Sequence, residues 1–391
     1  MTALSIVLLV VAVIAVAGAI VAVTAWAKAR ERAVRAEAVN RDLSEQLSHA
    51  YELPQVASQL GVPNQVALVY NPSKSASEEA LPIVSQACAL FGLDEPKFYQ
   101  TDPDDSGLAA VQQAVLDGAQ LVLVAGGDGT VRAAAKVLVD TDVQLAIIPT
   151  GTGNLLARNL ELPINDVQAC TYIAFNGQVR PIDVISLDML HDDGSWHAYV
   201  STVIAGAGFD AEIMHSTSDR LKAAAGWLAY TEAGMRKLRG KRHTVTITTA
   251  DGESKRSRVR SAMIANCGIL TGGINMLPEA VIDDGLLDVA LLDPRNLVDW
   301  MQMASSVLIP KQKIRRVTSF AVRNCKLEFD EPLVTQIDGD PIPATTEIVA
   351  KTIPRALPLR VPVTRPAEDA EAPEHTEQSA PSSPVFSSGD E

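Results

Sequence analysis

The chain has 391 residues, 47% of them hydrophobic and 4% aromatic, with a formal net charge of −14 at pH 7. This length predicts two domains with extensions, and the hydrophobic content is ample for buried cores. The acidity and the scarcity of aromatic side chains argue against a nucleic-acid partner. The cysteines lack CxxC spacing, which favours reduced thiols in a cytosolic compartment over a zinc site or a disulfide framework.

The N-terminal stretch from Leu4 to Trp26 contains no charged residue. At about 1.5 Å per residue, a helix of this length covers the roughly 30 Å hydrocarbon core of a bilayer. A cleaved signal peptide is the alternative, but Met1 to Ala3 carry no basic residue, and Lys28 and Arg30 follow the stretch. The positive-inside rule therefore predicts a retained single-pass anchor in the cell membrane over residues 1–27, with everything after Lys28 in the cytoplasm.

The segments that flank the predicted domains differ in composition. Residues 28–60 are charged and alanine-rich, which predicts a juxtamembrane helix and linker. Leu43 and Leu47 fit a short coiled-coil contact there, but a solvated spacer helix is favoured because two apolar positions are too few. Residues 362–391 are rich in Pro, Ser, Ala and Glu, which predicts a disordered acidic tail.

Strands and helices alternate in the first half of the core. The predicted strands are Gln65–Tyr70, Lys97–Thr101, Leu121–Val124 and Leu145–Pro149. The predicted helices are Ala76–Phe91, Gly107–Asp117, Val131–Asp140 and a segment that begins near Asn154. This alternation predicts an α/β domain over residues 61–181, with a parallel sheet covered on both faces. Ligands of such sheets bind beyond the carboxyl ends of the strands.

The second half of the core has a different pattern. Its short alternating runs predict strands at 198–204, 244–249, 258–264, 286–292, 313–322 and 325–329. Two helices are predicted, at 219–238 and 297–308. These elements indicate a largely β domain over residues 182–361.

A glycine turn, Gly126-Gly127-Asp128-Gly129-Thr130, connects the strand Leu121–Val124 to its helix. A strand, a glycine turn and a helix N-terminus aim backbone N–H groups at one point, which is typical of phosphate sites. Asp128 adds a carboxylate beside the phosphates, as a nucleotide-bound Mg²⁺ requires. A tight βα turn in which Asp128 caps the helix is the alternative. Further turns after Tyr70 and Ile148, at the same sheet edge, favour a nucleotide site.

The chain lacks the GxxxxGK[ST] and G-x-G-x-x-G fingerprints in these turns. Its strand ends carry Asn71-Pro72-Ser73, the glycine turn and Pro149-Thr150-Gly151-Thr152-Gly153-Asn154. Later segments are Ala205-Gly206-Ala207-Gly208-Phe209-Asp210, Gly272-Gly273, Pro278-Glu279-Ala280, Asp283-Asp284-Gly285-Leu286-Leu287-Asp288 and Asp338-Gly339-Asp340. From about Val62 to Arg360, this set resembles the diacylglycerol-kinase catalytic family, which includes sphingosine and ceramide kinases.

The resemblance implies an α/β nucleotide domain, similar to NAD kinases and phosphofructokinases, and a β-sandwich lipid domain, with the active site between them. It also implies that Val334 to Val361 return to pack against the nucleotide domain. The expected activity is transfer of the γ-phosphate of ATP to a lipid hydroxyl, with diacylglycerol as the favoured membrane lipid substrate. A kinase for a sphingoid base or another lipid alcohol, and a catalytically inactive lipid-binding scaffold, are the alternatives.

The resemblance also implies the residues of the site. Those expected to bind ATP are Asn71, Pro72, Ser73, Thr101, Gly126, Gly127, Asp128, Gly129, Thr130, Val131, Arg132 and Thr152. Asp284 resembles the family's structural Mg²⁺ ligand, with the backbone carbonyls of Val281 and Leu286, although an Asp-Gly hairpin turn explains this segment nearly as well.

Two residues are expected to act in catalysis. Asp340 stands where the family often has a Glu as proton acceptor, and Asp338 is a second carboxylate in the same turn. A carboxylate suffices as acceptor because phosphoryl transfer depends mainly on positioning and Mg²⁺. The hypothesis is that Asp340 accepts the proton while Asp128 organises Mg²⁺ and the phosphates.

Two basic stretches, 236–242 and 311–316, stand out in this acidic chain. They fit either attraction to an anionic membrane surface or an ordinary solvated surface. The sequence leaves the oligomeric state open, with a homodimer among the allowed assemblies.

Overall fold

The structure is a computed structural model that describes residues 63–102, 105–208, 241–269, 275–294, 299 and 317–363. The predicted anchor and juxtamembrane helix lie outside these residues, as does the acidic tail apart from Pro362 and Val363. The helix at 219–238 and nearly all of the helix at 297–308 lie outside as well. Both basic stretches also lie outside, apart from Lys241 and Arg242. Within the described ranges, no helix is both long enough and apolar enough to cross a bilayer.

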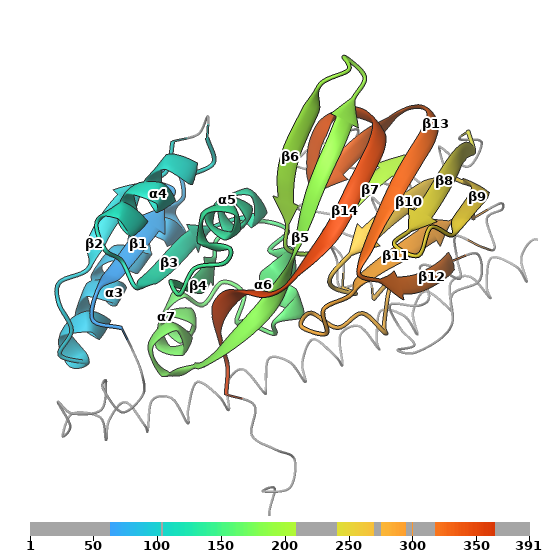
Figure 1. The fold of residues 1–391 in the computed structure, drawn as a ribbon. Helices are drawn as coiled ribbons and strands as arrows, with labels where there is room; N and C mark the ends of the chain where they lie inside the picture. The colour runs from blue at the N-terminus through green and yellow to red at the C-terminus, as the bar shows by residue number, and fades with distance from the viewer. Residues whose placement is uncertain are drawn as a thin grey trace, which may run out of the picture.

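A parallel four-stranded sheet forms the centre of the α/β domain, drawn in blue to green in Figure 1. Its strands are, in spatial order, β4 (Gln144–Pro149), β3 (Leu121–Gly126), β1 (Val66–Tyr70) and β2 (Lys97–Gln100). Every residue of β1 and β3 is buried, as expected for parallel strands covered on both faces. The predicted parallel sheet is confirmed.

Helices cover both faces of this sheet. They are α3 (Ser75–Leu90), α4 (Leu108–Leu116), α5 (Asp128–Leu138), α6 (Leu155–Asn159) and α7 (Val167–Asn176). Apolar side chains of α3 and α7 pack on one face of the sheet, and those of α4 and α5 pack on the other. The sequence analysis missed α7, although the Asp166 carboxylate caps it by accepting the backbone N–H of Ala169, a recognisable start signal.

The second domain is a β-sandwich. Its strands are β5 (Gln178–His191), β6 (Trp196–Ser201), β7 (Ile204–Gly208), β8 (His243–Thr249), β9 (Ser254–Val259), β10 (Ser261–Ala265), β11 (Leu287–Leu292), β12 (Val317–Val322), β13 (Asn324–Ile337) and β14 (Asp340–Val361). One layer runs β12-β11-β10-β7-β13, and the other runs β6-β5-β14-β13-β8-β9. Register shifts bend β13 and β14, so that β13 contributes to both layers around one apolar core.

Two predicted strands are each split into two. The strand predicted at 198–204 becomes β6 and β7, because the N–H groups of Thr202 and Val203 donate to the Asp338 carboxylate instead of a ladder. The strand predicted at 258–264 breaks at Arg260, because β9 pairs with β8 while β10 pairs with β7 and β11 in the other layer.

The last strand returns to the first domain. Leu359 of β14 pairs in parallel with Leu145 of β4, so β14 continues the α/β sheet after crossing the sandwich. A bulge near Arg355, whose φ is +52°, marks the crossing. The buried Asp183 carboxylate accepts the Arg355 N–H at 2.7 Å, which satisfies the donor that the bulge frees. Both domains thus share one continuous sheet.

Candidate active site

Three turns meet at the carboxyl edge of the parallel sheet. The N–H of Asn71 donates to Ala125 O at 3.4 Å, and the N–H of Thr150 donates to Gly126 O at 2.9 Å. These bonds hold the turns after β1, β3 and β4 side by side. A cavity of about 290 Å³ opens over them. Its lining residues are Asn71, Lys74, Thr101, Asp102, Ser106, Gly127, Asp128, Gly129, Thr130, Gly151, Thr152 and Asp340.

The glycines let two of these turns touch. A Cβ on Gly151 would lie 2.6 Å from the Cα of Gly127, and a Cβ on Gly153 would overlap the carboxylate of Asp128. Real Cβ atoms do not approach other atoms so closely, so a side chain at either position would push the turns apart. Glycine therefore keeps the backbone amides of both turns on one wall of the cavity.

Asp128 joins the same two turns through its carboxylate. Its Oδ2 accepts the N–H of Asn154 at 2.8 Å, and its Oδ1 accepts the N–H of Leu155 at 2.5 Å. The pKa of Asp128 is raised to about 6, mainly by burial and in smaller part by the charges of Asp338 and Asp340, while the two backbone hydrogen bonds act to lower it. Asp128 therefore caps the turn before α6 while it lines the cavity.

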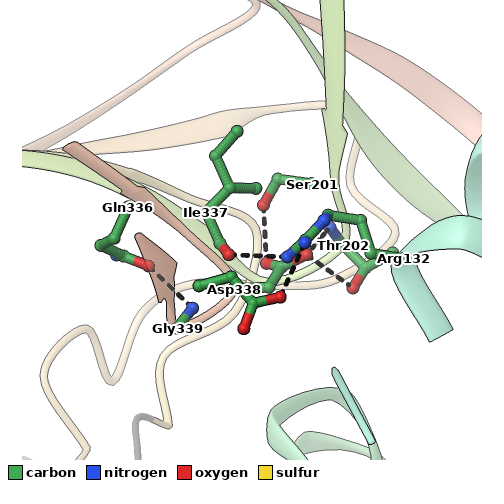
Figure 2. A network of polar contacts seen from close by, with 8 residues as sticks. Arg132, Ser201, Thr202, Gln336, Ile337, Asp338 and Gly339 are labelled. Atoms are coloured by element: carbon green, nitrogen blue, oxygen red, sulfur yellow. Dashed lines mark hydrogen bonds and ion pairs between the residues drawn. The ribbon is translucent and has the colours of Figure 1, made fainter. Parts of the chain in front are cut away.

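Asp338 and Asp340 occupy opposite environments in the turn between β13 and β14. The Asp338 carboxylate is buried and accepts a hydrogen bond from Ser201 Oγ at 2.7 Å (Figure 2). It also accepts the N–H groups of Val203 and Ile204, each at 3.0 Å. Asp340 has 49% of its side chain exposed and lines the cavity. Of these two carboxylates, only that of Asp340 faces the cavity.

The sandwich contributes Asp340 to a cavity that the α/β domain otherwise builds. Arg132 of α5 spans the junction, because its Nη2 donates to Asp340 Oδ2 at 2.7 Å and its Nη1 donates to Ile337 O at 2.7 Å. The predicted position of the site between the two domains agrees with this geometry.

The predicted ATP residues divide into two groups. Those that line the cavity are Asn71, Thr101, Gly127, Asp128, Gly129, Thr130 and Thr152. Those absent from the lining are Pro72, Ser73, Gly126, Val131 and Arg132. Val131 is buried in the core beneath the turn, and Gly126 packs against the Thr130 side chain.

The sequence analysis missed several residues of the cavity wall. Lys74 is the N-cap of α3, and its Nζ donates to Thr150 O at 3.4 Å. It is the one cation among the described lining residues. Lys74 directly follows Asn71-Pro72-Ser73, and this position could have indicated that it lies at the nucleotide site. Asp102 and Ser106, in the loop after β2, were missed because that loop carries no glycine motif.

The predicted metal site, at Asp284, Val281 and Leu286, lies in a loop before β11 that hydrogen bonds hold in place. The Leu286 N–H donates to Asp284 Oδ1 at 2.9 Å, and the Gly285 N–H donates to the buried Asp183 carboxylate at 2.6 Å. Burial raises the pKa of Asp288, and the charges of Asp284 and Glu279 raise it further. The described ranges hold no cluster of three acidic, histidine or cysteine side chains suited to a metal, so backbone carbonyls would have to complete this site.

Comparison with known proteins identifies both domains. Residues 65–187 match the diacylglycerol kinase catalytic domain, and residues 202–361 match the YegS C-terminal NAD kinase β-sandwich-like domain. The protein named probable lipid kinase YegS-like from Xanthomonas euvesicatoria pv. vesicatoria is 30% identical over 261 residues, 64% of this chain and 82% of the relative. The diacylglycerol kinase of Bacillus subtilis is 26% identical over 278 residues, 70% of this chain and 88% of the relative.

A solved structure shows the same fold. The crystal structure of a diacylglycerol kinase from Bacillus anthracis str. Sterne matches with a TM-score of 0.58 at 20% identity, covering 76% of this chain and 97% of that chain. The family matches cover the α/β domain and the sandwich, and the cavity lies where those two domains meet. The chain belongs to the family of lipid kinases that carry a diacylglycerol kinase catalytic domain.

Proposed function

We propose that this lipid kinase transfers the γ-phosphate of ATP to the hydroxyl of diacylglycerol, giving phosphatidic acid. The observation that carries the proposal is that three phosphate-type turns and the Asp340 carboxylate of the other domain line the same cavity. Phosphoryl transfer through a loose transition state needs a nucleotide and an acceptor hydroxyl held in line, and little covalent chemistry from the protein.

The nucleotide would lie on the glycine turns. Gly127, Gly129 and Gly151 line the cavity together with Thr101, Thr130 and Thr152, so backbone N–H groups and side-chain hydroxyls are available on this wall. These groups suit the oxygens of a triphosphate. Lys74 would add a positive charge on a wall that otherwise carries carboxylates.

Two carboxylates fit Mg²⁺, a hard cation that prefers oxygen ligands. Asp128 would hold the ion of MgATP, since each of its oxygens accepts one backbone N–H and retains a lone pair. Asp284, with the carbonyls of Val281 and Leu286, would hold the structural ion. Burial raises the pKa of Asp288 most, and a cation there would offset the smaller contribution of repulsion by Asp284 and Glu279. Bound Mg²⁺ supplies neutralisation of charge on the phosphates.

Asp340 would accept the proton of the lipid hydroxyl. The buried Asp338 is a poor candidate because its oxygens are engaged by Ser201 and by the chain from Thr202 to Ile204. Asp340 instead faces the cavity with half of its side chain exposed.

The test is phosphate transfer from γ-labelled ATP with Mg²⁺, offered diacylglycerol, a sphingoid base, other lipid alcohols and NAD in mixed micelles. The proposal is supported if the wild type forms labelled phosphatidic acid and if the Asp340→Asn and Asp128→Ala variants do not. A stronger signal on a sphingoid base would reassign the substrate. Absence of transfer to every acceptor, with ATP binding intact, would indicate an inactive lipid-binding scaffold.

We also propose that residues 1–27 anchor the enzyme to the cell membrane with both domains cytoplasmic, because its substrate stays in the bilayer. The support is the uncharged stretch from Leu4 to Trp26 followed by Lys28 and Arg30. The anchor would be supported if full-length protein stays in the membrane fraction after a carbonate wash. The cytoplasmic orientation would be supported if protease digests the domains only in inverted vesicles. A mature N-terminus beyond Trp26 would reject it.

A further inference from the structure

One arginine connects the nucleotide turn to the turn of the sandwich. Arg132 follows Asp128 by one turn of α5, so the two side chains leave the same side of the helix. Its Nη1 donates to Ile337 O and its Nη2 to Asp340 Oδ2, each at 2.7 Å. Figure 2 shows Arg132 beside Ile337, the last residue of β13. Asp340 begins β14, so one guanidinium holds both ends of the turn that presents Asp340.

The Asp340 carboxylate is held through one oxygen. Its Oδ2 receives the Arg132 hydrogen bond and lies over Gly129, where a Cβ would come within 3.2 Å of it. Among the residues that the structure describes, none donates a hydrogen bond to its Oδ1. Arg132 thus holds one oxygen and leaves the other available to take a proton in the cavity.

Orientation explains this arrangement better than stability does. The side chains of Arg132 and Asp340 are 21% and 49% exposed, and ion pairs so close to solvent contribute little to folding. A planar guanidinium that donates to both Ile337 O and Asp340 Oδ2, in contrast, restricts where the Asp340 carboxylate lies relative to the end of β13. Arg132 is also absent from the cavity wall, which argues against direct phosphate binding by its side chain.

We propose that Arg132 is a positioning residue that holds Asp340 in register with the nucleotide turn. The proposal rests on the proposed function, in which Asp340 takes the proton of the acceptor hydroxyl. Because Asp128 and Arg132 share α5, one rigid helix then places both the metal-binding carboxylate and the proton acceptor. The distance between phosphate and base is set by that helix.

The test compares Arg132→Ala and Arg132→Lys with Lys136→Ala, an exposed cation one turn further along the same helix. Arg132→Ala should lower kcat by about 10- to 100-fold, with KM for ATP and the Kd of ADP changed by less than about twofold. Arg132→Lys should recover part of kcat because it keeps one charged donor. Lys136→Ala should match the wild type.

A double-mutant cycle with Asp340→Asn isolates the positioning role. If Arg132 acts through Asp340, adding Arg132→Ala to Asp340→Asn should change kcat by less than about twofold. The proposal would be overturned if the losses in kcat of the two single variants multiply in the double variant. It would also be overturned if Arg132→Ala binds ADP tenfold more weakly with kcat unchanged. Wild-type protein that binds ADP but phosphorylates no lipid would instead reject the proposed function, and the role of Asp340 with it.

Discussion

Asp128 and Asn154 lie far apart along the chain, yet Oδ2 of Asp128 accepts the backbone N–H of Asn154 at 2.8 Å. Oδ1 of the same carboxylate accepts the N–H of the next residue, Leu155. One side chain therefore ties the turn after β3 to the turn after β4, and the cavity wall depends on it.

Replacement of Asp128 should harm both activity and stability. Asp128→Asn keeps the shape but replaces one accepting oxygen with an amide that donates, so a backbone N–H loses its partner. The free energy of unfolding should fall by about 1–3 kcal/mol. Transfer of phosphate should fall by more than the unfolded fraction explains, because the Mg²⁺ ligand is lost as well. Urea denaturation and turnover at saturating MgATP measure the two effects separately.

The pKa of Asp128 predicts a pH dependence. Burial raises it from 3.8 to about 6, so the folded chain binds a proton between pH 4 and 6 that the unfolded chain has released. Stability from this group is therefore present below pH 4 and is lost as pH rises through 6. Activity should change in the opposite direction and rise through about pH 6, because Mg²⁺ needs the carboxylate. Denaturation of the wild type at pH 4.5 and at pH 7 should show this contribution to the free energy of unfolding lost at the higher pH. Asp128→Asn should lack this contribution at both pH values.

Asp338 and Asp340 should respond differently to the same change. Asp338→Asn leaves buried donors of Ser201 and Val203 with a poorer acceptor, which should cost about 2–4 kcal/mol of unfolding free energy. Asp340→Asn, at a half-exposed position, should cost less than about 1 kcal/mol but abolish most turnover. Equal destabilisation by both variants would contradict the separate roles.

Gly151→Ala should separate the two glycine turns. The new Cβ would lie 2.6 Å from the Cα of Gly127, a contact that only backbone movement can relieve. We expect about 1–3 kcal/mol of destabilisation and weaker ADP binding in a fluorescence titration. Gly194→Ala is the control, since no atom lies within 4 Å of its Cβ and only its φ of +82° adds strain. The control should bind ADP normally.

Mg²⁺ should stabilise the fold through Asp284, independently of catalysis. Chelation with EDTA should lower the Tm of the wild type by a few degrees, and added Mg²⁺ should restore it. Asp284→Ala should have a Tm that does not respond to either treatment. Asp188→Ala, at an exposed position of β5, should keep the wild-type response. A metal-dependent Tm in Asp284→Ala would exclude this site.

Local amino-acid patterns were sufficient to predict the α/β domain and the three turns of the nucleotide wall. The fully apolar runs of β1 and β3 can be buried only in a sheet covered on both faces, and parallel strands place their carboxyl ends at one edge. Asn71, Asp128 and Thr152 therefore met in the cavity as expected. Local pattern was sufficient because each turn directly follows its own strand.

The packing of the two domains explains why Asp340, and not Asp338, faces the cavity. Both are Asp residues in one short turn, so local pattern does not distinguish them, and it was the family resemblance that favoured Asp340. Asp338 is buried because β6 and β7 supply donors from another part of the chain, whereas Arg132 of α5 draws Asp340 to the nucleotide turn. These partners lie more than a hundred residues away along the chain, so only the packed domains bring them together.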